Sequence, residues 1–187
     1  MMECWIPGEE ELRPGEDWRD YELRLYDLFK ADFLDGRPMF DGMPVRVRVN
    51  PKYDEREEAF WHLTCRDYSH GDGLPESRDP DMERCRRIRW PRAFIENHRA
   101  CALHSDMAGE CRGVMVWTAS HTVRRGRSVP RVKLFQEDES YLVVLEPRRK
   151  KGYCLLITAY HVEEEWSRRK IMREAEKNEA LFVGPCG

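Results

Sequence analysis

The first regular pattern of apolar residues along the chain is helical. Within residues 17–34, Tyr21, Leu25 and Phe29 recur at the spacing of one helix face, and the aspartate that opens the segment is suited to cap its first turn. The preceding residues, 1–16, hold two prolines, two glycines and five glutamates. We therefore expect an irregular lead-in followed by an N-terminal helix.

The next segments alternate as strands do or carry loop residues. Residues 43–50 read MPVRVRVN, in which valine alternates with arginine, so we expect a half-buried strand. The stretch AFWHLTCRDY, residues 59–68, is expected to form a second strand or a short transition. Residues 69–81 are rich in glycine, proline and aspartate, which predicts a loop. Two short helical segments are expected after it: one over residues 82–88, which Asp79 or Asp81 would start, and one over residues 90–98.

In the second half of the chain, the residue pattern is typical of β-strands. Four segments rich in β-branched or aromatic residues are separated by turn residues: 113–119, 131–136, 141–148 and 153–162. Gly152 lies between the last two apolar runs, so we expect a hairpin there. A helix is expected over residues 163–179 and a tail over 180–187. Helices followed by a run of antiparallel strands predict an α+β fold, with the N-terminal helix and the short helices packed on one curved antiparallel β-sheet and a C-terminal helix. We expect one domain over residues 17–179.

Composition narrows the class of protein. Hydrophobic residues make up 41% of the 187 residues, which is enough for a core, and charged residues make up 36%. No apolar run reaches the roughly 20 residues of a membrane helix, and no signal peptide is visible, so we expect a cytoplasmic protein without a membrane partner. The seven cysteines are then expected to be reduced. We expect neither a cofactor nor a metal, although a zinc site remains an alternative, with the candidate ligands His98, Cys101, His104 and Cys111.

Charge is distributed unevenly along the chain. Residues 1–35 hold eleven acidic and four basic side chains, a balance of −7, whereas residues 84–151 hold sixteen basic and seven acidic ones, a balance of +9. A basic face attracts phosphates whatever the net charge of the whole chain. A solvated surface with intramolecular ion pairs would explain the same pattern, and for the basic segments 84–92 and 124–133 the sequence leaves both interpretations open.

Two groups of polar residues are candidates for a site. His62, Thr64, Arg66 and Tyr68 are spaced two apart, so in a strand they would share one face. Thr158 and Tyr160 share a face in the last strand by the same argument, with Leu156 and Val162 expected beside them.

This set of residue types suits cleavage of an RNA backbone without a metal. Such cleavage needs a base for the 2′-hydroxyl proton, donors for the charge of the phosphorane, and an acid for the leaving oxygen. Histidine titrates near neutral pH, and arginine matches phosphate oxygens with its planar fork. Each residue alone has an ordinary structural explanation, such as an ion pair between Arg92 and Glu96 or a helix cap at Asn97.

Three short motifs, in order, resemble a known group of nucleases. FWHLTCRDY, then DPDMERCRRIRWPRAFIEN, then YLVVLEPRRKKGYCLLITAYHVE are similar to the phage-associated branch of the barnase–EndoU–colicin–RelE nuclease superfamily. The resemblance spans roughly residues 45–169. It implies a curved antiparallel sheet and a metal-independent endoribonuclease, often a toxin or a phage-defence effector.

The resemblance also assigns candidate residues. It implies catalytic roles for His62, Arg66, Arg92, Thr158 and Tyr160. We add substrate-binding candidates from their chemistry and from the resemblance: Thr64, Asn97, Trp90, Arg124, Arg125 and Arg127. RNA is the expected partner, and an antitoxin or regulatory protein is a further one.

The nuclease hypothesis makes a geometric prediction. His62, Arg66, Arg92 and Tyr160 should converge on one concave patch, bordered by a basic wall from residues 124–133 or 148–151. The alternative is a non-catalytic module on the same fold that binds nucleic acid or, through its acidic helix, a protein.

Overall fold

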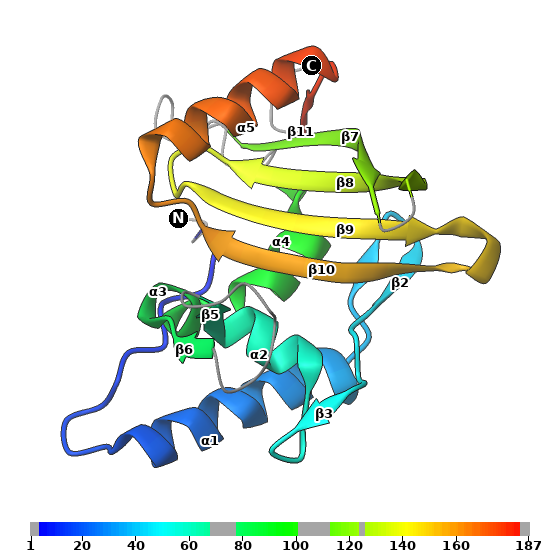
Figure 1. Ribbon diagram of the computed structural model, residues 1–187. Coiled ribbons are helices and arrows are strands. Elements are labelled where there is room, and N and C mark those ends of the chain that lie inside the picture. Colours follow the sequence, from blue (N-terminus) through cyan, green and yellow to red (C-terminus); the bar gives the residue numbers. More distant parts are fainter. Residues whose placement is uncertain (1–3, 68–77, 101–112, 124–125, 184–187) are drawn as a thin grey trace.

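The computed structural model describes residues 4–67, 78–100, 113–123 and 126–183, and it confirms the expected α+β fold (Figure 1). The described residues form a seven-stranded sheet with the order β1-β2-β10-β9-β8-β7-β11. Its strands are β1 (Met39–Phe40), β2 (Met43–Arg46), β7 (Val114–Thr122), β8 (Ser128–Gln136), β9 (Tyr141–Arg148), β10 (Tyr153–His161) and β11 (Leu181–Val183). Neighbouring strands are antiparallel except β2 and β10, which pair in parallel.

Helices lie on both sides of this sheet. They are α1 (Trp18–Phe29), the π-helical turn η1 (Lys30–Leu34), α2 (Glu58–Thr64), α3 (Met82–Arg86), α4 (Trp90–Asn97) and α5 (Glu165–Lys177). Two small hairpins complete the described structure: β3 (Lys52–Tyr53) with β4 (Arg56–Glu57), and β5 (Cys65–Asp67) with β6 (Arg78–Pro80). Figure 1 shows α1 and α2 below the sheet and α5 above it. None of the described helices is long and apolar enough to cross a membrane.

Local signals in the sequence fix several element boundaries. The Asp17 carboxylate accepts a hydrogen bond from the Asp20 backbone N–H at 2.9 Å and so caps α1. Asp81 caps α3 in the same way, accepting from the N–H groups of Glu83 and Arg84. The turn between β9 and β10 is closed by Gly152, whose φ of 71° is the left-handed conformation that glycine adopts without strain. These expected helix starts and the expected hairpin are confirmed.

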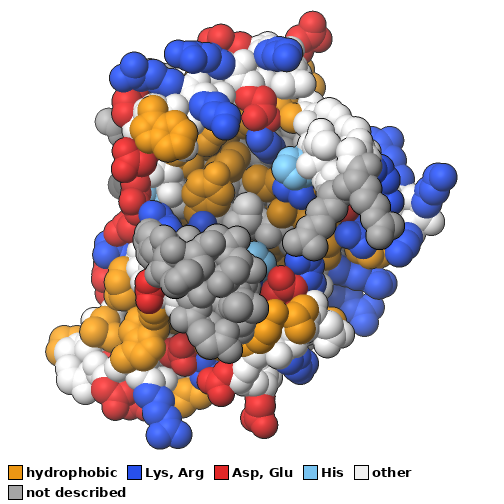
Figure 2. Space-filling model, in the orientation of Figure 1, with side chains coloured by type: hydrophobic (Ala, Val, Ile, Leu, Met, Phe, Trp, Pro, Cys, Tyr) orange, Lys and Arg blue, Asp and Glu red, His pale blue; other side chains and the backbone are white. Residues whose placement is uncertain are grey.

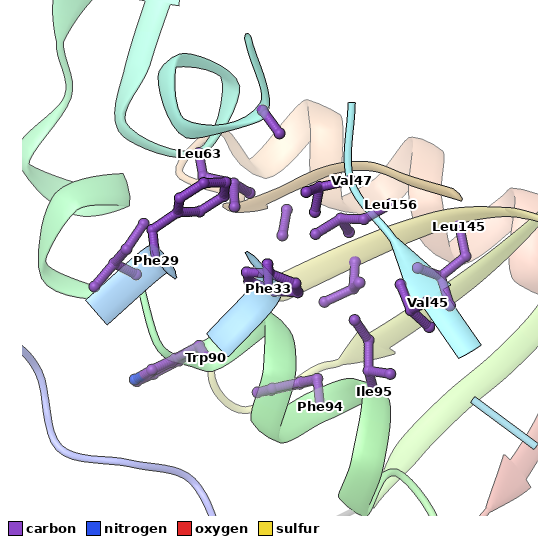
Figure 3. Close-up of a cluster of buried hydrophobic side chains, with 14 of the residues drawn as sticks. Phe29, Phe33, Val45, Val47, Leu63, Trp90, Phe94, Ile95, Leu145 and Leu156 are labelled. Atoms are coloured by element: carbon purple, nitrogen blue, oxygen red, sulfur yellow. The ribbon is translucent and has the colours of Figure 1, made fainter. Parts of the chain in front are cut away.

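The core consists of two apolar layers, one on each face of the sheet. The larger layer packs the sheet against α1, α2 and α4, and Figure 3 shows Phe29, Leu63, Phe94 and Leu145 converging there from different elements. The smaller layer lies under α5 and includes Ile171 of that helix. Burial of apolar area on both faces is the main stabilising contribution to such a fold.

The sequence interpretation fails in four places. Within the segment expected to be a strand or a short transition, residues 58–64 form helix α2 and only Cys65–Asp67 form a strand. Residues 78–80, within the expected loop, form β6. Residues 181–183, expected in the tail, form β11 and pair with β7. The strand expected over 43–50 ends at Arg46.

The helix at α2 has a physical reason. Ala59, Phe60, Leu63 and Thr64 are buried. That is the i, i+1, i+4, i+5 spacing of one helix face, and it outweighs the alternation of polar residues in the same segment.

The acidic lead-in is bound to the basic segment around α3. Glu9 pairs with Arg86 and Arg87, and Glu10 pairs with Arg24 of α1. The Tyr21 hydroxyl also donates to the Glu10 backbone carbonyl at 2.7 Å. Much of the charge separation seen along the sequence is therefore neutralised within the molecule, and for residues 84–92 intramolecular ion pairing is the better explanation.

Gly36 lies where the chain leaves η1 and is expected to be intolerant of a side chain. A Cβ there would lie 2.5 Å from the Ala31 carbonyl oxygen and 2.8 Å from that of Asp32. Because both contacts are with backbone, we expect Gly36→Ala to lower the free energy of unfolding by about 1–3 kcal/mol. Urea denaturation measures this change, and Gly8→Ala is the matched control because a Cβ at Gly8 meets nothing within 4 Å. Equal stability of the two variants would contradict the steric argument.

Candidate functional site

A hollow of about 520 Å³ opens on the α5 side of the sheet. Figure 2 shows this face, with Lys and Arg side chains along its top and right edges. The polar residues that line the hollow include His121, Arg131, Lys133, Thr158, Tyr160 and Lys177. Arg131 and Lys133 come from β8, within the segment 124–133 that was expected to supply a basic border, and Lys133 pairs with Glu174 of α5 at 2.6 Å.

Thr158 and Tyr160 share this face, as expected, but Leu156 does not. The register of β10 against β9 shifts between Leu156 and Thr158, which makes Ile157 an extra residue. Leu156 therefore packs into the larger core layer, while Thr158 and Tyr160 line the hollow. The expectation that Leu156 flanks the pair on the same face is wrong, because the bulge reverses the alternation.

His62 lies on α2 beside the middle of β10. Its Nε2 is 3.2 Å from Glu58 Oε1, one helical turn earlier, and Glu58 also binds Arg48 Nη1 at 3.1 Å. Arg48, His62 and Ile157 line a small pocket of about 90 Å³ at this edge of the sheet. The side chain of His62 is 40% exposed, so its ring is within reach of solvent and of a ligand.

The surroundings of His62 favour its neutral form. Burial lowers the pKa of His62 below its ordinary value of 6.5, and the charges of Arg78 and Arg48 lower it further. The Glu58 carboxylate opposes these effects because it favours the charged imidazolium. At neutral pH, His62 is therefore mainly uncharged and able to accept a proton.

Arg84 connects His62 to Tyr160. Its Nη1 donates to the His62 backbone carbonyl at 2.6 Å, and its guanidinium carbon lies 5.2 Å from the centre of the Tyr160 ring. The cation is thus held over an aromatic face, an arrangement that is favourable where water is excluded. Burial raises the pKa of the Tyr160 hydroxyl, so this group keeps its proton at neutral pH.

Arg66 lies next to this group and is held by two carboxylates. It pairs with Asp81, which also lies 3.4 Å from Arg84 Nε, and its Nη2 donates to Glu163 Oε1 at 2.7 Å. Glu163 lies two residues after the end of β10, so the ion pair joins segments 97 residues apart. Of the four residues expected to converge, Arg66 shares Asp81 with Arg84, Tyr160 contacts Arg84 through its ring, and His62 contacts it through its backbone carbonyl. The imidazole of His62 lines the 90 Å³ pocket, whereas Tyr160 lines the 520 Å³ hollow, so the expected convergence of the polar groups on one patch is met only in part.

The fourth residue, Arg92, lies elsewhere. On α4 its guanidinium pairs with Glu96 at 3.2 Å and with Asp32 at 3.5 Å. Asn97 is on the same helix, and its amide donates to the Ala93 carbonyl at 3.0 Å. The prediction that Arg92 joins the patch is wrong, because the face of α4 that carries it is directed toward η1. Asn97 shares that location and is not part of the hollow.

Two other expected binding residues belong to the core. Trp90 is 4% exposed and packs between Phe94 and Tyr141, so its ring cannot stack on a base. Thr64 is 3% exposed, and its hydroxyl donates to the Phe60 carbonyl at 2.9 Å, the bond that closes the last turn of α2. Both substrate-binding predictions are wrong because helix packing buries these side chains.

The remaining expected residues are only partly described. Arg127 is exposed just before β8. Tyr68, Arg124 and Arg125 lie outside the described residues, as do three of the four alternative zinc ligands. The fourth, His98, is buried, with its Nδ1 3.0 Å from the Ile95 carbonyl oxygen and its Nε2 3.3 Å from Asp41.

Several residues of the site were not predicted from the sequence. Glu58 is four residues before His62, a spacing that is informative only once the segment is known to be helical. Arg84 was one of several arginines in a basic run, and nothing local distinguishes it from its neighbours. Glu163 and Arg48 come from distant segments, and their positions depend on the folded chain.

Comparisons with known proteins add no relative to this picture. No protein-family model, curated protein or solved structure matches the chain. The interpretation of function therefore depends on the three short motifs and on the geometry of the site.

Proposed function

We propose that the protein is a metal-independent endoribonuclease whose substrate lies across the α5-side hollow and the adjoining edge of β10. The observation that carries the proposal is the neutral, half-exposed His62, held by Glu58 and connected through Arg84 to Tyr160. A proton acceptor, guanidinium groups and a protonated hydroxyl along the edge of β10 are the groups that phosphodiester cleavage requires.

In the mechanism we favour, Glu58 orients the imidazole. When the Nε2 proton of His62 is directed to Glu58, Nδ1 carries the lone pair and takes the proton from the RNA 2′-hydroxyl. The 2′-oxygen then attacks the phosphorus, and the 5′-oxygen leaves with a proton, giving a 2′,3′-cyclic phosphate. Arg66 and Arg84 offset the extra negative charge of the phosphorane, and Thr158 and Tyr160 orient the phosphate or a base.

The chemistry of the product tests this function. Purified protein is incubated with a single-stranded RNA oligonucleotide in EDTA, and the fragment ends are identified by mass spectrometry. We expect cleavage to persist and to leave 2′,3′-cyclic phosphate and 5′-hydroxyl ends. Loss of cleavage in EDTA, or 5′-phosphate ends, would contradict the mechanism.

Glu163 is expected to restrain the site. Its carboxylate holds Arg66 in place of a phosphate, so RNA must displace it before Arg66 can bind the backbone. We expect Glu163→Gln to tighten RNA binding by about 3–10-fold, because the Glu163 carboxylate no longer competes with an RNA phosphate for Arg66. Filter binding at fixed salt measures this change. Glu165→Gln is the control, because within the described part of the chain Glu165 pairs with the exposed Arg169 of α5 and not with Arg66.

One observation favours the alternative of a binding module without catalysis. Arg66 is held by two carboxylates, and Arg84 already covers one face of the Tyr160 ring. In that case the same surface would bind RNA with a steep salt dependence, and removing the His62 imidazole would leave the affinity unchanged. The absence of any new RNA ends in the product assay would favour this alternative.

A further inference from the structure

A second hollow lies away from the proposed RNA site, between η1, β2 and the start of β10. It is an open groove of about 540 Å³. Its lining includes the aliphatic side chains of Leu34, Pro44, Val49 and Leu155. Val49 is 43% exposed, and together with the partly exposed Leu34 and Pro44 it gives the groove an apolar surface open to solvent.

The border of this groove is basic. Arg37 and Arg46 line it and are exposed, and within the described part of the chain no carboxylate pairs with either of them within 4 Å. The tip of the β9–β10 hairpin, Arg149–Lys151, carries three more cations and precedes the groove residue Tyr153 in the chain, although these three side chains do not line the groove. This differs from the segment around α3, where the arginines pair with acidic side chains.

The chemistry of the groove favours a peptide over RNA as its occupant. Base recognition on single strands depends on open aromatic faces. The aromatic side chains that line this groove are Phe33, which is 6% exposed and packed in the core, and Tyr153. The guanidinium of Arg46 lies 4.8 Å from the Tyr153 ring centre and that of Arg148 lies 5.9 Å from it.

We propose that this groove binds an acidic segment of a partner protein. Aliphatic side chains of the segment would fill the space over Val49 and Leu155, and its carboxylates would pair with Arg37 and Arg46. Guanidinium groups form bidentate bonds with carboxylates, so these two arginines give the interaction its charge selectivity. The proposal is independent of the nuclease function, because none of these residues belongs to the RNA site.

Selection from a phage-displayed library of random 12-residue peptides tests the proposal. The full-length protein is the target, and enriched peptides are synthesised and measured by fluorescence anisotropy. We expect enriched peptides to combine aspartate or glutamate with leucine, isoleucine or valine. The double variant Arg37→Glu/Arg46→Glu should weaken their binding at least tenfold, whereas Arg19→Glu/Arg173→Glu, an equal charge change at two exposed positions elsewhere, should leave it within about twofold.

Other outcomes would overturn the proposal. They are a selection without enrichment, enriched peptides whose affinity is the same for both double variants, and peptides that bind equally well after their aliphatic residues are replaced by serine. Binding of a labelled oligouridine that is lost in Arg37→Glu/Arg46→Glu but kept in the control would identify the groove as an RNA surface instead.

Discussion

His62→Ala is expected to lower the rate of RNA cleavage by about 10²–10⁴-fold while leaving the fold and the affinity for RNA nearly unchanged. This is the range that a positioned general base contributes. The side chain of His62 is 40% exposed and interacts with Glu58 on its own helix, so its removal disturbs little packing. Single-turnover kinetics on a defined oligonucleotide, together with urea denaturation, separates the loss of chemistry from a loss of stability.

The matched control is His161→Ala. His161 follows Tyr160 on β10, so its side chain lies on the opposite face of the sheet, where its Nδ1 is 4.0 Å from Glu83. We expect this variant to cleave RNA at nearly the wild-type rate. If both histidine variants lose the same fraction of activity, His62 has no special role in the reaction.

The pH dependence gives a second readout for His62. Its pKa is lowered from 6.5 by burial and by the charges of Arg78 and Arg48. A general base must be unprotonated, so the rate should rise with pH below 6.5 and be level at neutral pH, where His62 is already uncharged. If the rate of RNA cleavage falls as the pH rises toward 6.5, His62 acts as the general acid instead.

Asp81→Ala is expected to have the largest effect on stability, lowering the free energy of unfolding by about 3 kcal/mol. Asp81 is 5% exposed, caps α3, and pairs with both Arg66 and Arg84. Removing one partner of a buried ion pair leaves uncompensated charge and costs about 3–5 kcal/mol. We expect the lower end of this range because Arg66 keeps its ion pair with Glu163.

Asp81→Asn separates the two contributions of this side chain. Asparagine caps a helix about as well as aspartate, so this variant loses the charge and keeps the cap. Its free energy of unfolding should exceed that of Asp81→Ala by about 1 kcal/mol. Urea denaturation measures this difference from the two midpoints, provided that both variants have the same m-value. If the alanine variant is as stable as the wild type, the ion pairs at Asp81 contribute nothing to the fold.

The Asp81 variants also bear on the site itself. Asp81 holds Arg66 and Arg84 close to each other, although their like charges repel. Without the carboxylate we expect Arg84 to move from the His62 carbonyl and the Tyr160 ring, which lowers activity together with stability. A loss of activity in Asp81→Asn at temperatures where it remains folded would show that the position of these arginines matters for the reaction.

Local chemistry in the sequence determined much of the fold. Segments rich in β-branched and aromatic residues, separated by turn residues, predicted β7, β8, β9 and β10. Asp17 and Gly152 marked a cap and a turn correctly, and of the two aspartates expected before α3 it is Asp81 that caps the helix, since each acts on the backbone within a few residues. The α+β class followed from the order of these elements.

Only the tertiary structure decided the composition of the site. The segment with His62 could pair as a strand or pack as a helix, and contact with the core chose the helix, which buried Thr64 and placed Glu58 beside the imidazole. A single extra residue at Ile157 directed Thr158 and Tyr160 into the hollow. Packing of α4 against the sheet buried Trp90 and directed Arg92 to Asp32. These outcomes depend on contacts between residues far apart in the chain, and a local sequence pattern does not predict such contacts.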